Sequence, residues 1–458
     1  MSRSTTVSGN RAPSRYLVVV ATFGTLVLCP TGAHAVPSFA RQTGLACNGC
    51  HTTPPELNGA GRRFKLLGYT DRHQDTPAVE NEEGKKHAGL DILKTLPLSA
   101  WFETSFTSTS KTIDGTQNGS FQFPQDVSLF LAGAWSTHVG SFLQITYDPQ
   151  ADHFSMDNTD IRITDKGTLG GKELVYGLTL NNNPTLEDLW HTTPAWGFPF
   201  VASPSAPSPA AAPFVQGALA QDVAGLGGYA MWNDRLYAAV AIYRSNHLGG
   251  TQPNPGTGYA FNIQGAAPYW RVAWQQPIGD NNFLEFGTYG MNMSSTPNGV
   301  SGLRDVFTDW AVDLQYDQTL FVRDVLSFRG AYVRETSSLN ATFDQGGADR
   351  VDHDLTMWNV NVEYHFGNVL SAAVGYVNTT GASDALLYAP AAVSGSASGS
   401  PNSTAFTGNV SWWPTQNVQL AIQYTDYTKF NGASTNYDGA GRNASDNNTM
   451  YLLARFIF

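Results

Sequence analysis

The chain has 458 residues, of which 41% are apolar, 12% aromatic and only 14% charged, against about 25% charged in average soluble proteins. Frequent aromatic residues exclude a disordered chain. After position 28 the sequence has no apolar run of the roughly 18 residues that a spanning helix needs, which excludes a bundle of transmembrane helices. Low charge, 45 glycines and evenly spread polar residues are typical of a transmembrane β-barrel, in which lipid-facing and lumen-facing residues alternate.

Residues 1–35 are predicted to be a cleaved secretory signal. A basic start leads into an apolar core, Tyr16 to Leu28, and then into the A-x-A site at Ala33 to Ala35, so the mature chain should begin at Val36. A membrane anchor is disfavoured because the apolar run is too short. The leader holds three of the 26 basic residues and no acidic residue, so the mature chain has 23 basic and 37 acidic residues. This acidic balance argues against nucleic-acid binding.

Two cysteines remain in the mature chain, and they stand in Cys47-Asn48-Gly49-Cys50-His51. C-x-x-C-H is the signature of covalent c-type haem attachment. Positions i, i+3 and i+4 share one helix face, so Cys47 and Cys50 can bond to a haem while His51 binds its iron. The alternative is a disulfide or redox dithiol followed by a chance histidine. The sequence thus predicts one covalently bound haem c with His51 as the proximal ligand.

A short helix is expected after the motif, with Leu57, Phe64 and Leu67 lying on the haem. Basic residues of this segment are candidates for pairing with the haem propionates, the alternative being a solvated basic patch: Arg62, Arg63 and Lys65. The distal iron ligand stays open, and the candidates from the sequence are His73, His87, Met156, Met231, Met291 and Met293.

Residues 36–96 form the predicted haem segment, and residues 97–458 form the predicted barrel. A segment as short as 36–96 seldom supports a core of its own. We therefore expect it to be buried in the barrel lumen as a plug.

From Leu98 onward, apolar residues alternate with polar ones between clusters of Gly, Asn, Asp and Pro, as in β-strands. Sixteen strands are predicted, an even number as in bacterial barrels. Their connections alternate between short turns and long loops, which places the turns in the periplasm and the loops outside. A soluble propeller or sandwich, the alternative, does not need this alternation. The predicted strands are 98–106, 127–135, 139–147, 157–165, 171–181, 221–232, 235–245, 259–275, 282–293, 305–317, 322–335, 354–366, 369–379, 404–413, 417–430 and 447–458.

Three further features fit an outer-membrane barrel. The chain ends on an aromatic residue, Phe458, in register with Phe456. Loop 182–220 is rich in proline and aromatic residues, and it is either a gate folded into the barrel mouth or a plain surface loop. Tryptophans near the strand ends are predicted to form aromatic girdles: Trp101, Trp135, Trp190, Trp232, Trp270, Trp412 and Trp413.

The segment Val36 to His51, with its F-A-R-Q-T-G run, resembles the start of the fused monohaem cytochrome–porins of iron-oxidising bacteria. Glu56-Leu57 and Gly61 to Tyr69 match the run that follows the haem motif in that family, and the rest of the chain matches only in architecture. The resemblance implies an outer-membrane Fe(II) oxidase that passes electrons to a periplasmic cytochrome c or blue-copper protein. It also implies that Cys47 and Cys50 carry the thioether bonds and that His51 is the proximal ligand.

Two other functions stay open: a redox conduit with another donor or direction, and a diffusion porin with a non-catalytic haem plug. Both chain ends are expected on the periplasmic side, and oligomers are possible. Acidic loop residues are expected either to attract Fe(II) or simply to be solvated: Asp114, Asp152, Asp157, Asp344, Asp349 and Asp438.

Overall fold

The computed structural model describes residues 36–71, 97–149, 152–246, 262–279, 281–297, 302–321 and 323–458. The predicted signal and the candidate ligands His73 and His87 lie outside the described residues. The described chain begins with three short helices, α2 (Pro37–Thr43), α3 (Cys47–Cys50) and α4 (Gly59–Leu66). No helix in these ranges is long and apolar enough to cross a lipid bilayer.

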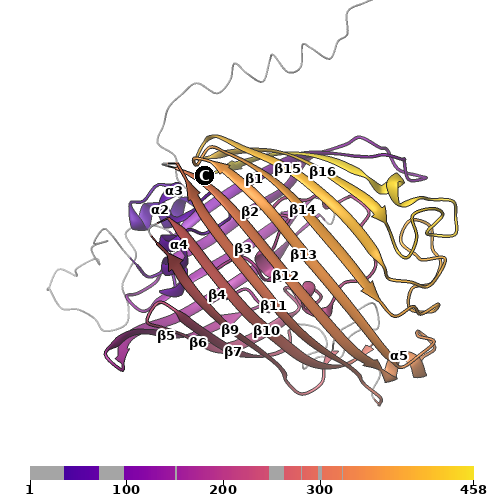
Figure 1. The fold of residues 1–458 in the computed structure, drawn as a ribbon, viewed down its shortest axis with the longest axis horizontal. Coiled ribbons are helices and arrows are strands. Elements are labelled where there is room, and N and C mark those ends of the chain that lie inside the picture. The colour runs from indigo at the N-terminus through magenta and orange to yellow at the C-terminus, as the bar shows by residue number, and fades with distance from the viewer. Residues whose placement is uncertain are drawn as a thin grey trace, which may run out of the picture.

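Sixteen antiparallel strands follow and close into a barrel (Figure 1), which confirms the predicted fold class. Strands β1 and β17 close the ring through pairs that run from Trp101↔Ile457 to Thr109↔Thr449. A two-residue strand, β8 (Asn262–Ile263), adds to the end of β10. The sixteen barrel strands are β1 (Leu98–Thr109), β2 (Ser120–Ala134), β3 (Val139–Asp148), β4 (His153–Leu169), β5 (Lys172–Asn181), β6 (Val223–Trp232), β7 (Leu236–Ser245), β9 (Ala267–Ile278), β10 (Asn282–Thr296), β11 (Asp305–Leu320), β12 (Asp324–Leu339), β13 (Asp352–Phe366), β14 (Leu370–Gly381), β15 (Ser403–Thr415), β16 (Val418–Lys429) and β17 (Thr449–Ile457).

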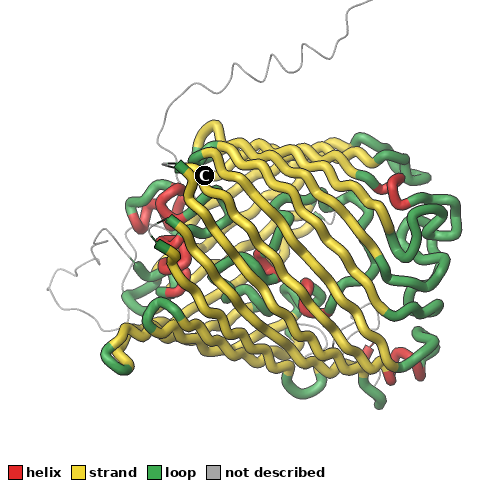
Figure 2. The backbone as a smooth tube through the Cα atoms, in the orientation of Figure 1, coloured by secondary structure: helices red, strands yellow, loops and turns green. Residues whose placement is uncertain are grey.

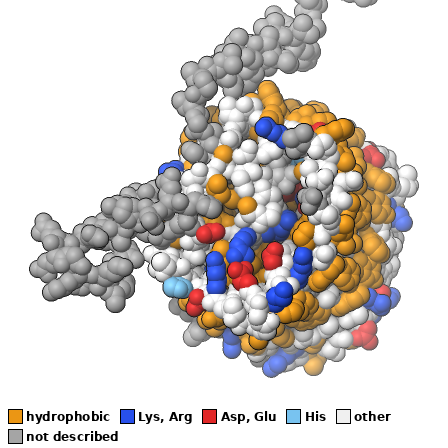
Figure 3. All heavy atoms as spheres, turned by 60° about the vertical axis from the view of Figure 1, so that its left-hand side comes forward, with side chains coloured by type: hydrophobic (Ala, Val, Ile, Leu, Met, Phe, Trp, Pro, Cys, Tyr) orange, Lys and Arg blue, Asp and Glu red, His pale blue; other side chains and the backbone are white. Residues whose placement is uncertain are grey.

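Side chains alternate between the two faces of the barrel wall. In β7, Val240 and Ile242 face outward and are 63% and 56% exposed, whereas Tyr237 and Tyr243 face the lumen and are fully buried. The outward face is apolar on the other strands too, and hydrophobic side chains cover the side wall in Figure 3. A wall that is apolar outside and polar inside is the surface of a membrane-spanning barrel.

The predicted tryptophan girdles are only partly present. Trp190 is 2% exposed and Trp413 is 6% exposed, while Trp101 packs edge-on against Phe130 with ring centroids 4.9 Å apart. The girdle prediction is therefore wrong for these three residues, because aromatic side chains also fill the lumen. The other four expose 37–47% of their surface: Trp135, Trp232, Trp270 and Trp412.

Long loops and short turns lie at opposite ends of the barrel, with one departure from the predicted alternation. Strand β3 ends at Asp148 and β4 begins at His153, so these strands are joined at the long-loop end by only a short connection. The C-terminus and helices α2–α4 lie together at the short-turn end (Figure 1). There the backbone N–H of Cys47 donates to Oε1 of Gln416, in the turn between β15 and β16, at 2.9 Å.

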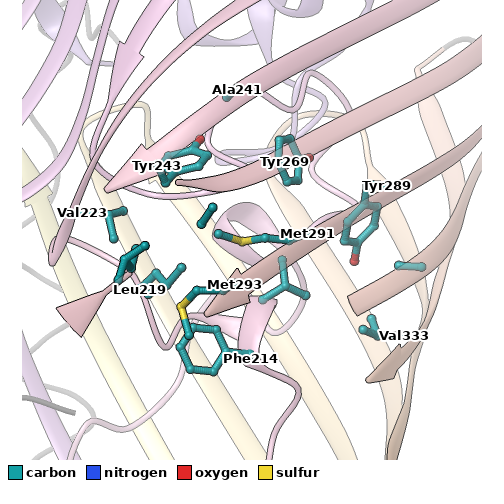
Figure 4. Packing of buried hydrophobic residues seen from close by; sticks show 14 residues of the cluster. Phe214, Leu219, Val223, Ala241, Tyr243, Tyr269, Tyr289, Met291, Met293 and Val333 are labelled. Carbon is teal, nitrogen blue, oxygen red and sulfur yellow. The ribbon is translucent and has the colours of Figure 1, made fainter. Parts of the chain in front are cut away.

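Loop 182–220 lies inside the barrel (Figure 2), so the interpretation as a surface loop is wrong. It contains the 3-10 turns η1 (Pro194–Trp196) and η2 (Phe214–Gln216). Near η2, Phe214 and Leu219 pack against Met291 and Met293 of the wall (Figure 4). Polar contacts fasten the loop to strands around the lumen: Thr192–Asp313, Phe198–Asn359, Ser203–Thr107, Pro207–Tyr427 and Val215–Asp309. The lumen is thus filled by a loop at mid-height and by the three helices at the short-turn end.

Two further short helical elements lie between strands of the barrel. Helix α5 (Asn340–Asp344) follows β12, and η4 (Ala444–Asn447) precedes β17. In both places the chain turns back toward the next strand at the long-loop end of the barrel.

Candidate functional site

The first four residues of the C-x-x-C-H motif form a single helical turn in the lumen, and His51 follows it with an extended backbone, outside the predicted helix. Cys47 and Cys50 begin and end α3, and both thiols are free. The N–H of His51 donates to the carbonyl oxygen of Cys47 at 3.0 Å and closes this turn. Asn58 caps α4 by accepting hydrogen bonds from the N–H groups of Ala60 and Gly61. Asn58 Nδ2 also donates to the carbonyl oxygen of Gly49 in α3 at 3.3 Å, so this residue joins the two helices.

A cavity of about 460 Å³ lies between these helices, the wall and loop 182–220. This volume falls within the roughly 300–1,000 Å³ of small-molecule and cofactor sites. Cys47, Cys50 and His51 all line it. The rest of the lining is mostly apolar and aromatic, and includes Leu45, Pro54, Leu57, Phe64, Tyr69, Trp101, Phe130, Phe142, Trp196 and Phe200. An apolar slot with two thiols and an imidazole at its edge fits a haem.

The thiols and the imidazole of the motif are uncharged at neutral pH. Burial raises the pKa of the Cys47 thiol to about 12, and burial together with Asp71 raises that of Cys50. Redox-active C-x-x-C pairs have lowered thiol pKa values, and the shift here is in the opposite direction. Burial lowers the pKa of His51 to about 4, and its Nδ1 is buried without a hydrogen-bond partner among the described residues. A neutral imidazole is the form that binds iron.

The apolar residues predicted to lie on the haem divide between the cavity and the wall. Leu57 and Phe64 line the cavity, whereas Leu67 packs into a cluster with wall residues. Phe39 lines the cavity together with Leu57 and Phe64, whereas Leu67 was expected there. The Phe39 ring lies 5.0 Å from that of Phe64 and 5.4 Å from that of Tyr69. Phe39 comes from α2, and its role depends on how α2 packs against α4.

The three basic residues predicted for the haem propionates have different surroundings. Lys65 lines the cavity, donates to the carbonyl oxygen of Asp188 at 2.5 Å and lies over the Trp196 ring. Arg62 lies over the ring of Phe283 in the wall, and Arg63 pairs at the surface with Glu173 at 2.9 Å. Neither arginine lines the cavity.

One cation of the cavity lining, Arg455, was not among the residues predicted from the sequence. Arg455 of β17 lines the cavity, pairs with Glu103 and lies 4.4 Å above the Trp101 ring. Its position near the C-terminus gives no local signal of a haem contact. Only closure of the barrel brings β17 beside β1 and the cavity.

A buried arginine of the wall, Arg162, holds the helical segment, residues 36–71, in place. Arg162 donates to Asp160 at 2.7 Å and to the carbonyl oxygen of Lys65 at 3.0 Å. Tyr69 donates to the same carboxylate at 2.8 Å. Because these groups are fully or almost fully buried, removing one of them would leave a charge without compensation.

A second buried cluster joins the segment to β12 and β13. Glu56, Glu363 and His365 bring possible ligand atoms within 4.8 Å of one another. Arg329 lies 2.5 Å from Glu56 and 4.0 Å from Glu363. Its guanidinium supplies the positive charge there, so the cluster is an anchor of the helical segment.

The methionines proposed as distal ligands do not reach the cavity. Met231, Met291 and Met293 are buried in hydrophobic clusters of the wall, and Met156 is 42% exposed. None of the four lines the cavity. A histidine of loop 182–220, His191, does line it and is 4% exposed. Burial and then the charge of Lys65 place its pKa well below the ordinary value, and His51 lowers it further.

The acidic residues proposed to attract Fe(II) also have distinct surroundings. Asp157 lines the cavity and accepts hydrogen bonds from Thr146 and Gln221. Asp438 is buried and accepts backbone N–H groups, including those of Val393 and Arg442. Asp438 therefore orders its loop and offers no open carboxylate to a passing cation.

Gly61 permits the close approach of α4 to α3, and this gives a first prediction. A Cβ at Gly61 would lie 2.1 Å from the carbonyl oxygen of Cys50. We expect Gly61→Ala to push the helices apart, at a cost of about 1–3 kcal/mol. Limited proteolysis of the folded protein should then cut residues 36–71 faster.

Gly59→Ala is the matched control for that experiment. A Cβ at Gly59 would meet only the end of the Arg62 side chain, at 4.0 Å, and alanine favours helix. We expect its cleavage rate to equal or fall below that of the wild type. Equal cleavage rates for Gly61→Ala and Gly59→Ala would contradict the contact between α3 and α4.

The closed antiparallel wall, its apolar outer face and its polar lumen define a transmembrane β-barrel of the outer-membrane type. No protein-family model and no curated protein matches the sequence. Among solved structures the chain is similar to OmpT of Vibrio cholerae, at 10% identity and a TM-score of 0.42, over 81% of this chain and 100% of that one. It is also similar to the channel DcaP of Acinetobacter baumannii, at 11% identity and a TM-score of 0.44, over 79% and 96%. For OmpF of Salmonella typhi in complex with daunomycin the identity is 12% and the TM-score 0.45, over 79% and 97%.

Proposed function

We propose that the protein is an outer-membrane monohaem cytochrome that oxidises extracellular Fe(II) and passes the electrons to a periplasmic carrier. One observation carries the proposal: the C-x-x-C-H turn opens onto an apolar cavity of about 460 Å³ inside a closed barrel. The free thiols, the imidazole of His51 at the cavity edge and the resemblance of residues 36–69 to the fused cytochrome–porins support it.

The residues around the cavity have different roles in binding a haem. The Cys47 and Cys50 thiols would hold a haem through two thioether bonds. His51 would hold its iron through the imidazole. The bound haem supplies a reversible one-electron acceptor, while the protein sets its environment and access. Leu57, Phe64 and Trp196 keep water from the cavity and Lys65 offers a cation to a propionate.

The position of the cavity supports a direction for electron transfer. Helices α2–α4 lie at the short-turn end, which faces the periplasm in outer-membrane barrels. In Figure 3 acidic and basic side chains gather at this end, and the exposed pair Arg63–Glu173 belongs to it. A charged rim suits a transient complex with a small cytochrome c or blue-copper protein. Fe(II) approaches from the long-loop end and gives up one electron, leaving Fe(III) outside.

Addition of Fe(II) to the purified holoprotein tests the proposal. We expect prompt reduction of the haem, seen in the visible spectrum, with one electron taken from each Fe(II). The Cys47→Ser/Cys50→Ser double variant is the control, because it should assemble the barrel without covalent haem. Failure of Fe(II) to reduce the wild-type haem at any accessible pH would rule out the oxidase.

The barrel itself favours a second candidate, a diffusion channel whose helical segment is a plug without turnover. Swelling of liposomes in small solutes would support this channel. A redox conduit with another donor or direction is distinguished by its reductant. Such a conduit would be reduced by a periplasmic donor and would not respond to Fe(II).

A further inference from the structure

His191 reaches the haem cavity from a part of the chain far from the C-x-x-C-H motif. It belongs to loop 182–220, between β5 and β6, and it lines the same cavity as Cys47, Cys50 and His51. Its imidazole is stacked on the Trp196 ring, with centroids 4.9 Å apart and an angle of 12° between the planes. The loop thus presents a flat, oriented imidazole to the cavity.

One nitrogen of this imidazole has no partner. The His191 side chain is only 4% exposed. Its Nδ1 is buried and makes no hydrogen bond among the described residues. A buried polar atom without a partner is costly, and most such atoms in folded proteins are paired. A histidine that served only packing would be expected to have a hydrogen-bonded ring. Because Nδ1 has no exposed surface, Nε2 is the ring nitrogen that could bind a ligand in the cavity.

The turn that carries His191 is rigid and strained. His191 has φ +60°, a left-handed conformation that is uncommon for residues other than glycine. The Asp188 carboxylate holds the turn by accepting from the N–H groups of Trp190, Thr192 and Thr193 at 3.0–3.1 Å. Asp188 is in turn fixed to Arg271 at 3.2 Å. Strain of this kind persists where the surroundings enforce it, often at ligand sites.

The other possible iron ligands of the cavity are committed elsewhere. Tyr69 donates its hydroxyl to Asp160 at 2.8 Å. Lys65 donates to the carbonyl oxygen of Asp188, and Asp157 accepts from Thr146 and Gln221. Cys47 and Cys50 are assigned to the covalent attachment. Only His51 and His191 remain among the described side chains that line the cavity and have a ligand atom for iron.

We infer that His191 is the second protein ligand of the haem iron, with His51 as the first. The inference rests on the proposed function, because it requires a haem at Cys47 and Cys50. Two imidazoles would fill both axial positions and leave no open site for oxygen or carbon monoxide. They would also give a lower reduction potential than a histidine–methionine pair. The site would then pass electrons without binding small molecules at the iron.

Spectroscopy of the full-length holoprotein tests the assignment. We expect a low-spin haem in the wild type, and in His191→Ala the loss of the low-spin signature with rapid carbon monoxide binding to the ferrous form. His191→Met keeps a ligand of similar size and should shift the potential upward. Met231→Leu is the matched control, and its spectrum and potential should equal those of the wild type.

The outcomes separate the ligand assignment from the proposed function. If His191→Ala retains covalent haem and keeps the low-spin spectrum of the wild type, His191 is not the ligand. If His191→Ala fails to assemble, an unchanged potential and spectrum in His191→Met overturns the assignment instead. A pyridine haemochrome assay that finds no covalent haem in the wild type refutes the proposed function, and the ligand assignment falls with it.

Discussion

Replacement of Arg271 by methionine is expected to release loop 182–220 from the barrel wall. Arg271 is fully buried, and its guanidinium lies 3.2 Å from Asp188, 3.2 Å from Glu285 and 2.8 Å from Asp313. Removing one partner of a buried ion pair typically costs about 3–5 kcal/mol, because the remaining charges lose their compensation. Limited proteolysis should then cut within loop 182–220, while heat-modifiable migration on gels shows that the barrel remains closed.

Arg63→Met is the control for this experiment. Arg63 pairs with Glu173 at the surface, where the two side chains are 39% and 44% exposed. Exposed pairs of this kind contribute about 0–1 kcal/mol, so the loop should stay resistant. If Arg271→Met were as resistant as Arg63→Met, the buried cluster would not be what holds the loop.

The same cluster makes the loop sensitive to acid. Burial alone would raise the pKa of Asp188, but Arg271 and Lys65 outweigh it and lower this pKa to about 2. An aspartate in an unfolded chain has a pKa of about 3.9. The stabilisation is therefore complete above about pH 4 and is lost as the pH falls toward the folded value. Wild-type loop cleavage by an acid-active protease should rise across this window, and Arg271→Met should show a smaller rise.

The barrel was predictable because its physical constraint acts on every residue of a strand. Lipid on one face and a polar lumen on the other impose a period of two, which is visible in β7 from Leu236 to Ser245. The turn of C-x-x-C-H was predictable for a similar reason, since Cys47 and Cys50 are neighbours on one helical turn and His51 follows it directly. Patterns of this kind do not depend on how distant segments pack.

The interior of the barrel was not predictable in this way. Trp190 was assigned to the lipid interface because its local sequence does not distinguish a lipid-facing aromatic from one that fills the lumen. His191 was absent from the ligand candidates, because its approach to His51 depends on Asp188, Arg271 and Lys65 packing together. The proline-rich, aromatic composition of loop 182–220 was the one signal that the loop enters the barrel mouth.

His51→Ala is expected to have the largest effect on the proposed site. Its imidazole lines the cavity directly after the two cysteines, and it has a buried Nδ1 without a partner among the described residues. Loss of this ligand should leave haem attached at Cys47 and Cys50 but without the reducible low-spin spectrum. Absorption spectra of the oxidised and reduced protein, with a redox titration, measure the change.

The barrel should survive this substitution, because the wall makes its own hydrogen bonds from β1 round to β17. His138→Ala supplies the control: His138 lies exposed in the turn between β2 and β3 and does not line the cavity. Its spectrum should match that of the wild type. An unchanged spectrum in His51→Ala as well would refute His51 as the proximal ligand and remove the chemical basis for electron transfer through this cavity.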